Sequence, residues 1–121
     1  MDAQIVPLFF TERTRRDRPE LVERFVRAAN GFPREGTARA AIAVVVRRRD
    51  VLPLIHAIRV PTLVACGKED RATEPVHSER IAARIPGARL AWIEHAGHAS
   101  VLEQPKAATD LLIPFVRDAL A

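Results

Sequence analysis

The feature that most constrains the fold is a short, almost entirely apolar run at positions 60–66, Val-Pro-Thr-Leu-Val-Ala-Cys. Pro61 stands at the start of the run, where a missing backbone donor matters least, and Gly67 ends it. A run of this length and composition is typical of a β-strand that is buried on both faces. Such strands occur in parallel sheets covered by helices, so the run predicts an α/β protein.

A helix and a second strand are expected directly after this run. Residues 75–85 favour a helix, with Ile81 and Ile85 four positions apart, and Pro86-Gly87 stops it. Residues 88–93 are typical of a second strand. The crossover in such a unit is almost always right-handed, which makes the two strands parallel. Both strands then end at one edge of the sheet, where open α/β sheets bind ligands.

The rest of the chain is expected to be helical. A helix should begin at Pro19 and end at Asn30-Gly31. A second should run from about Gly36 to Arg48, although the three valines at 44–46 are weak helix formers, and Asp50 could cap a short third. A last helix is expected from Gln104 onward, kinked at Pro114. We therefore expect a helical segment over 1–57, followed by a β-α-β-α unit with two parallel strands over 58–121.

Composition and charge restrict the partners and the compartment. The net charge is +4, and residues 1–59 hold twelve basic and seven acidic groups. A nucleic acid could bind Arg47, Arg48 and Arg49, but the chain has no Tyr and one Trp for base stacking, so we expect solvated helix faces and no nucleic-acid partner. Cys66 is the single cysteine, no apolar stretch reaches 18 residues, and the start lacks a positively charged region. These features predict a cytoplasmic protein without a membrane partner.

Two residues with complementary chemistry follow the two expected strands. Asp70 lies in the loop after the first strand, and His98 lies in the loop after the second. A carboxylate beside an imidazole fixes its tautomer and stabilises its charged form, so the pair could act as a general base. The alternatives remain open at this point, because Asp often forms turns or caps helices and His in a Gly-containing loop is often simply solvated.

Other reactive side chains give weaker signals. A metal site could use His95 and His98 with Glu94 and Glu103, but this spacing in a loop is no zinc signature. Cys66 lies in an apolar run, which disfavours the reactive thiolate. Ser100 follows His98 too closely to act as its nucleophile and is expected to start a helix. We expect no metal and no cofactor.

Several segments together resemble the C-terminal portion of the α/β-hydrolases. The first is Ile58–Asp70, which resembles their late strand and acid loop. Three further segments resemble their closing strand, their histidine loop and the start of their last helix. These are Ile85–Leu90, Ala96-Gly97-His98 and Leu102-Glu103-Gln104-Pro105. The resemblance covers 58–121 and implies that Asp70 is the triad acid and His98 the general base. It also implies an ester, lactone or related small-molecule acyl substrate.

The resemblance extends weakly to the first half. Residues 1–57 resemble the end of the helical cap that many members insert over the site. The segments Leu8–Glu12 and Arg18–Glu20 are similar to caps of the enol-lactonase and carboxylic-ester branch.

The pattern G-x-S-x-G of the nucleophile is not found in the sequence, whose only serines are Ser78 and Ser100. We therefore expect a C-terminal fragment of a serine hydrolase that carries the acid and the histidine but no nucleophile, and that is inactive alone. A non-catalytic binding or oligomerisation module is the alternative. Two apolar parallel strands leave an open sheet edge, which predicts a homo-oligomer completed through that edge.

Overall fold

The structure is a computed structural model that describes residues 5–121. Its first part is helical, with α1 (Val6–Phe9), α2 (Glu12–Asp17), α3 (Pro19–Asn30) and α4 (Arg34–Ala41). Helix α3 begins with Pro19 in its first turn and ends at Asn30, which confirms the helix expected there. Thr11 caps α2, because its side-chain oxygen accepts a hydrogen bond from the Thr14 N–H.

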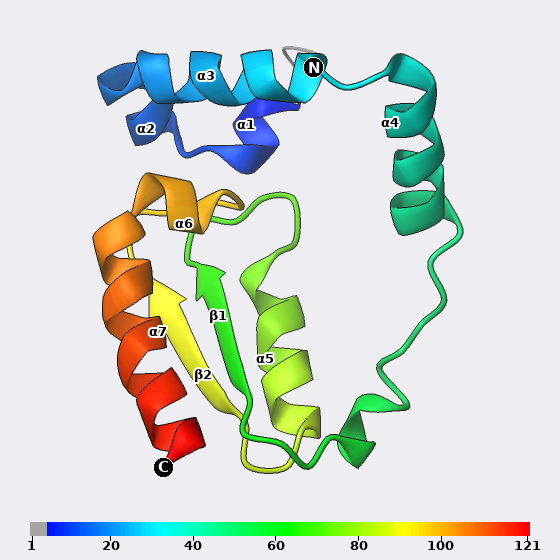
Figure 1. Cartoon of the computed structure of the whole chain (residues 1–121), viewed down its shortest axis with the longest axis vertical. Helices are drawn as coiled ribbons and strands as arrows, with labels where there is room; N and C mark the ends of the chain where they lie inside the picture. Colours follow the sequence, from blue (N-terminus) through cyan, green and yellow to red (C-terminus); the bar gives the residue numbers. More distant parts are fainter. Residues whose placement is uncertain (1–4) are drawn as a thin grey trace.

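The second part is the expected β-α-β-α unit. Strand β1 (Leu63–Gly67) is followed by α5 (Pro75–Arg84) and strand β2 (Arg89–Ile93), and then by α6 (Ser100–Glu103) and α7 (Pro105–Leu120). The strands pair in parallel, with Leu63 opposite Arg89 and Gly67 opposite Ile93. Helices α5 and α7 flank the strand pair from opposite sides, and both arrows point toward the N-terminal helices (Figure 1).

Two buried clusters stabilise the fold, one within the β-α-β-α unit and one between the two parts. Helix α7 packs against the end of β2 through Ala108, which lies with Ile93 and Ala96. The second cluster joins Phe10 and Leu21 of the N-terminal segment to Ala99, directly after His98. Burial of these apolar side chains places helices α1 to α3 over the carboxyl ends of the strands, where Figure 1 shows them.

The sequence-based bounds of the second helix were wrong. Helix α4 ends at Ala41, and the chain continues as a π-helical turn over Ile42–Val46. The three successive valines at 44–46 are β-branched and lose side-chain freedom in an α-helix, which accounts for the change. The residues of this turn are exposed, Val45 to 78%.

The prediction of a short helix capped by Asp50 was also wrong. The Asp50 carboxylate accepts a hydrogen bond from the Leu52 N–H at 2.9 Å, and the only helical turn nearby is a 3-10 turn at Ile55–Ala57. Pro53 is the reason, because the residue before a proline is disfavoured in α-helical conformation.

The helix lengths bear on the membrane prediction. The longest helix, α7, has 16 residues and continues through Pro114. Within residues 5–121, no helix has the length and apolar character needed to cross a membrane.

Candidate active site

The loops that follow β1 and β2 are bonded to each other at the carboxyl edge of the sheet. The Lys68 N–H donates to the Ile93 carbonyl at 3.1 Å, and the Glu69 N–H donates to the Ala96 carbonyl at 2.9 Å. His95 adopts a left-handed conformation, with φ of 55°, where the second loop turns. These bonds fix the Asp70 loop against the His98 loop.

Asp70 and His98 face each other across these loops. His98 Nδ1 lies 2.9 Å from Asp70 Oδ2, which is hydrogen-bond distance. The Asp70 side chain is 6% exposed, whereas the His98 side chain is 35% exposed. One member of the pair is therefore buried and fixed, and the other reaches the surface.

The Asp70 carboxylate accepts hydrogen bonds from four groups. The backbone N–H groups of Ala72 and Thr73 donate to Oδ1, each at 2.9 Å. The Thr73 hydroxyl and His98 Nδ1 both lie 2.9 Å from Oδ2. Burial raises the pKa of Asp70, but the hydrogen bonds from Thr73, His98 and Ala72 together outweigh it, so the pKa lies below its ordinary value. Asp70 is thus held as a carboxylate.

This arrangement decides the tautomer of neutral His98. A carboxylate can only accept, so Nδ1 must carry the proton that lies between the two residues. The lone pair of the neutral ring is then on Nε2. A ring in this state can accept a proton at Nε2 while the carboxylate stabilises the resulting charge.

Phe9 holds the His98 ring from the N-terminal side. The two ring centroids lie 4.9 Å apart with planes at 85°, an edge-to-face contact. The Ala99 N–H also donates to the Phe9 carbonyl at 2.8 Å. Phe9 therefore fixes both the ring and the backbone that follows it.

The other candidates from the sequence lie elsewhere or are bonded otherwise. Cys66 is buried in β1 with its Sγ 3.3 Å from the Gly67 carbonyl, and Ser100 begins α6 as expected. Glu103 is buried and accepts hydrogen bonds from Thr11 and Gly97. No group of three or more His, Cys, Asp and Glu side chains suited to a metal occurs in residues 5–121.

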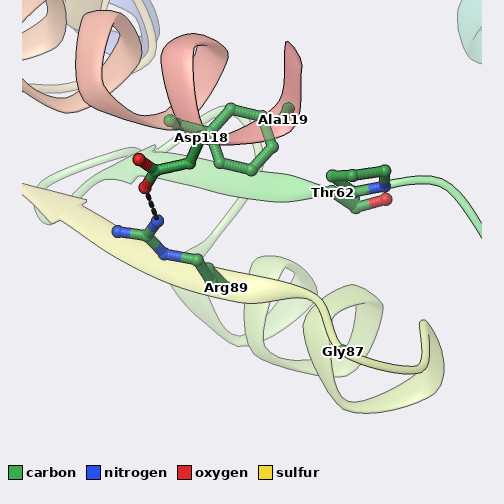
Figure 2. Close-up of a pocket in the computed structure, with 7 residues that line it drawn as sticks. Thr62, Gly87, Arg89, Asp118 and Ala119 are labelled. Atoms are coloured by element: carbon green, nitrogen blue, oxygen red, sulfur yellow. Dashed lines mark ion pairs between the residues drawn. The ribbon is translucent and has the colours of Figure 1, made fainter. Parts of the chain in front are cut away.

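A pocket of about 160 Å³ lies at the opposite, amino ends of the strands (Figure 2). Arg89 pairs there with Asp118 at 3.6 Å and stacks its guanidinium over Phe115, 5.9 Å from the ring centroid. The two charged side chains that line this pocket, Arg89 and Asp118, form an exposed ion pair with each other. The Asp70–His98 pair is therefore the better candidate for chemistry.

Sequence reasoning missed three groups around the pair, Thr73, Phe9 and Glu103. The spacing of Asp70 and Thr73 could have signalled the turn, because Asp side chains often bond backbone groups two or three residues on. Phe9 and Glu103 lie in segments that resemble the family, and the sequence offers Glu103 as a metal ligand, but no pattern predicts their contacts with the histidine loop. Phe9 is distant in sequence, and glutamate is almost never fully buried unless it is paired.

The fold and this pair define a class: an α/β protein that holds an acid–histidine pair at the carboxyl edge of a parallel sheet. Residues 2–111 match the model of the alpha/beta hydrolase family. The chain belongs to this family.

Solved structures agree with this assignment. A thermophilic esterase from Thermogutta terrifontis, solved with malate bound, superposes with a TM-score of 0.90 at 32% identity over 96% of the chain. An enzyme described as degrading N-acyl homoserine lactones gives a TM-score of 0.75 at 28% identity over 93% of the chain. The chain spans 42% and 45% of these two proteins.

Curated relatives match a smaller part. The chain is 37% identical over 73 residues, or 60% of its length, to polyketide synthase ThaQ of Burkholderia thailandensis, of which the match covers 4%. It is 30% identical over 59 residues, or 49% of its length, to monoacylglycerol lipase ABHD6 of Bos taurus, of which the match covers 18%. The similarity to the enol-lactonase branch stays a prediction.

Proposed function

We propose that this chain supplies the acid and the general base of a serine hydrolase that acts on ester, lactone or related acyl substrates. The observation that carries the proposal is the 2.9 Å contact between His98 Nδ1 and the buried carboxylate of Asp70. Family membership and the similarity to an esterase and a lactone-degrading enzyme support the choice of chemistry.

The chemistry follows from the tautomer. A serine hydroxyl attacks the substrate carbonyl and gives its proton to Nε2 of His98, which passes it to the leaving group as the acyl–serine ester forms. Water then attacks this ester, gives its proton to Nε2, and the acid and the free serine are released as that proton returns to the serine oxygen. Asp70 orients the ring and stabilises the imidazolium. The serine and the oxyanion donors would come from sequence outside these 121 residues, since no G-x-S-x-G pattern occurs within them.

The test uses the product of the full reading frame that encodes this chain, assayed with p-nitrophenyl esters. We expect His98→Ala and Asp70→Asn each to lower kcat by roughly 10³-fold or more. The matched control is His56→Ala, because His56 is exposed in the 3-10 turn Ile55–Ala57, which precedes β1 and lies away from the carboxyl edge of the sheet (Figure 1). Turnover that is unchanged in His98→Ala would remove His98 from the mechanism.

A second function, a non-catalytic module that binds a partner or a second copy, is favoured by one observation. The segment from α4 to β1 exposes several large apolar side chains, namely Ile42, Val44, Val45, Val46, Val51 and Leu54. A gene in which G-x-S-x-G precedes these residues in the same reading frame would favour the hydrolase. A start signal at Met1 with no hydrolase sequence before it would favour the module.

A further inference from the structure

Glu103 is a carboxylate buried between the N-terminal helices and the histidine loop. It is the last residue of α6 and is only 1% exposed. A carboxylate in such a place destabilises the fold unless each oxygen is hydrogen bonded. The proposed reaction does not use Glu103, so its burial needs another explanation.

Its two oxygens join two segments that are far apart in sequence. Oε1 accepts hydrogen bonds from the N–H and the hydroxyl of Thr11, at 2.8 and 2.9 Å. Oε2 accepts a hydrogen bond from the N–H of Gly97 at 2.5 Å. Gly97 directly precedes His98, so the carboxylate fixes the Ala96–Gly97 peptide unit, one residue before the histidine.

Further contacts from the N-terminal segment hold the same stretch. The Arg18 guanidinium donates to the carbonyls of Leu102 and Glu103, both at 2.9 Å. A methyl group on Gly97 would lie 3.1 Å from the Phe9 carbonyl and 3.2 Å from Glu103 Oε2, so the backbones are closely packed. Residues 9–18 therefore contact both the histidine loop and the end of α6 that carries Glu103.

We propose that Glu103 is a positioning residue for His98. It makes no hydrogen bond to the imidazole, but it fixes the Ala96–Gly97 peptide unit of the histidine loop so that His98 Nδ1 stays in line with Asp70. Small displacements of an acid–base group are enough to lower catalysis strongly. Through Thr11, the same carboxylate makes the geometry of the pair depend on the N-terminal helices. The inference rests on the proposed acid–base pair.

The hydrogen bonding explains why an amide cannot replace this carboxylate. Both oxygens of Glu103 face donors, and a glutamine has one oxygen and one NH₂ group. In either orientation, Glu103→Gln brings two donors together while the side-chain volume stays the same. Thr11→Val removes the hydroxyl that donates to Glu103 and, with it, the oxygen that caps α2. Thr11→Ser retains both.

The test measures the tautomer of neutral His98 in this chain. Ring ¹⁵N NMR shifts are recorded at a pH well above that at which histidine side chains ordinarily become protonated. The wild type should be mainly protonated on Nδ1. We expect a roughly fivefold lower ratio of the Nδ1–H to the Nε2–H form in Glu103→Gln, and a smaller decrease in Thr11→Val. Thr11→Ser should match the wild type. So should Glu79→Gln, which removes an exposed carboxylate on α5.

The outcomes separate this inference from the proposed function. Asp70→Asn should reverse the tautomer, because the amide would donate to Nδ1; an unchanged tautomer there would overturn the acid–base pair itself. A second outcome would overturn the positioning role alone. In that outcome the tautomer reverses in Asp70→Asn, but folded Glu103→Gln and Thr11→Val keep the wild-type ratio of the Nδ1–H to the Nε2–H form. If circular dichroism shows that Glu103→Gln is unfolded, the comparison of Thr11→Val with Thr11→Ser decides.

Discussion

A methyl group at Gly67 would stand 2.3 Å from the carbonyl oxygen of Gly97. It would also lie 2.4 Å from the carbonyl oxygen of Ala96, and a Cβ atom essentially never makes non-bonded contacts this short. Only glycine at the end of β1 therefore allows the histidine loop to pass so closely. This approach brings Asp70, three residues further on, within reach of the ring of His98.

Substitution of Gly67 should therefore separate the two loops. We expect Gly67→Ala to lower the free energy of unfolding by about 1–3 kcal/mol, because backbone rather than a flexible side chain must move. Urea unfolding measures the change. Gly36→Ala is the matched control, since nothing lies within 4 Å of the added methyl group in α4. Gly36→Ala should raise the free energy of unfolding by up to about 1 kcal/mol. If Gly67→Ala is as stable as the wild type, the close packing of the two loops at Gly67 is contradicted.

The stability of the fold should depend on pH through Asp70. Its pKa in the folded chain lies below the ordinary value of 3.8, because hydrogen bonds to the ionised form outweigh the effect of burial. The folded state therefore binds fewer protons than the unfolded state near this pH. The stabilisation is fully present above about pH 4 and is lost as the pH falls through the lowered pKa.

Asp70→Asn should remove this dependence. At neutral pH we expect it to lower the free energy of unfolding by about 1–3 kcal/mol, and the difference from wild type should shrink below about pH 4. Urea unfolding at a series of pH values measures it. Asp110→Asn, which removes an exposed carboxylate on α7, should change stability by less than about 0.5 kcal/mol. A difference that stays constant into acid would rule out the ionised, hydrogen-bonded state of Asp70.

The sequence predicts the half of the fold whose elements depend on local patterns. The apolar run that became β1, the helix α5 and the strand β2 are close in the chain, and the handedness of such units makes the strands parallel. The meeting of Asp70 and His98 at one edge follows from that topology. The start of α3 at Pro19 follows from local capping chemistry in the same way.

The remaining features depend on contacts between distant residues. Nothing near Glu103 in sequence indicates that its partners are Thr11 and Gly97, because 92 positions separate it from Thr11. Phe9 reaches His98 only because helices α1 to α3 pack over the strand ends. The end of α4 was missed for a local reason, since the apolar residues at 42–46 continue the helical pattern although their β-branching disfavours it.

Thr73 should tune the charge of Asp70. Its hydroxyl donates to Asp70 Oδ2 at 2.9 Å, and this bond favours the ionised carboxyl. We expect Thr73→Val to raise the pKa of Asp70 and to lower the free energy of unfolding by about 0.5–1.5 kcal/mol. Carboxyl ¹³C shifts followed against pH measure the first effect. Thr73→Ser keeps the hydroxyl and should titrate as wild type does; identical titrations of Asp70 in the valine variant and the wild type would exclude the role.

The predicted self-association can be tested at the open edge of β1. The backbone groups of Thr62 and Lys68 bond to β2, so by the alternation along a strand those of Leu63 and Ala65 point to the other edge. If a second copy pairs there, light scattering should give a mass that falls on dilution.

Amide exchange then locates the contact. The Leu63 and Ala65 amides should exchange slowly in the associated form and faster on dilution, while the amide of Arg89, which donates to the Thr62 carbonyl, serves as an internal reference. A monomer at every concentration, with fast exchange at Ala65, would show that the edge stays unpaired in this chain. Association with a fast-exchanging Ala65 would instead direct attention to the exposed valines after α4.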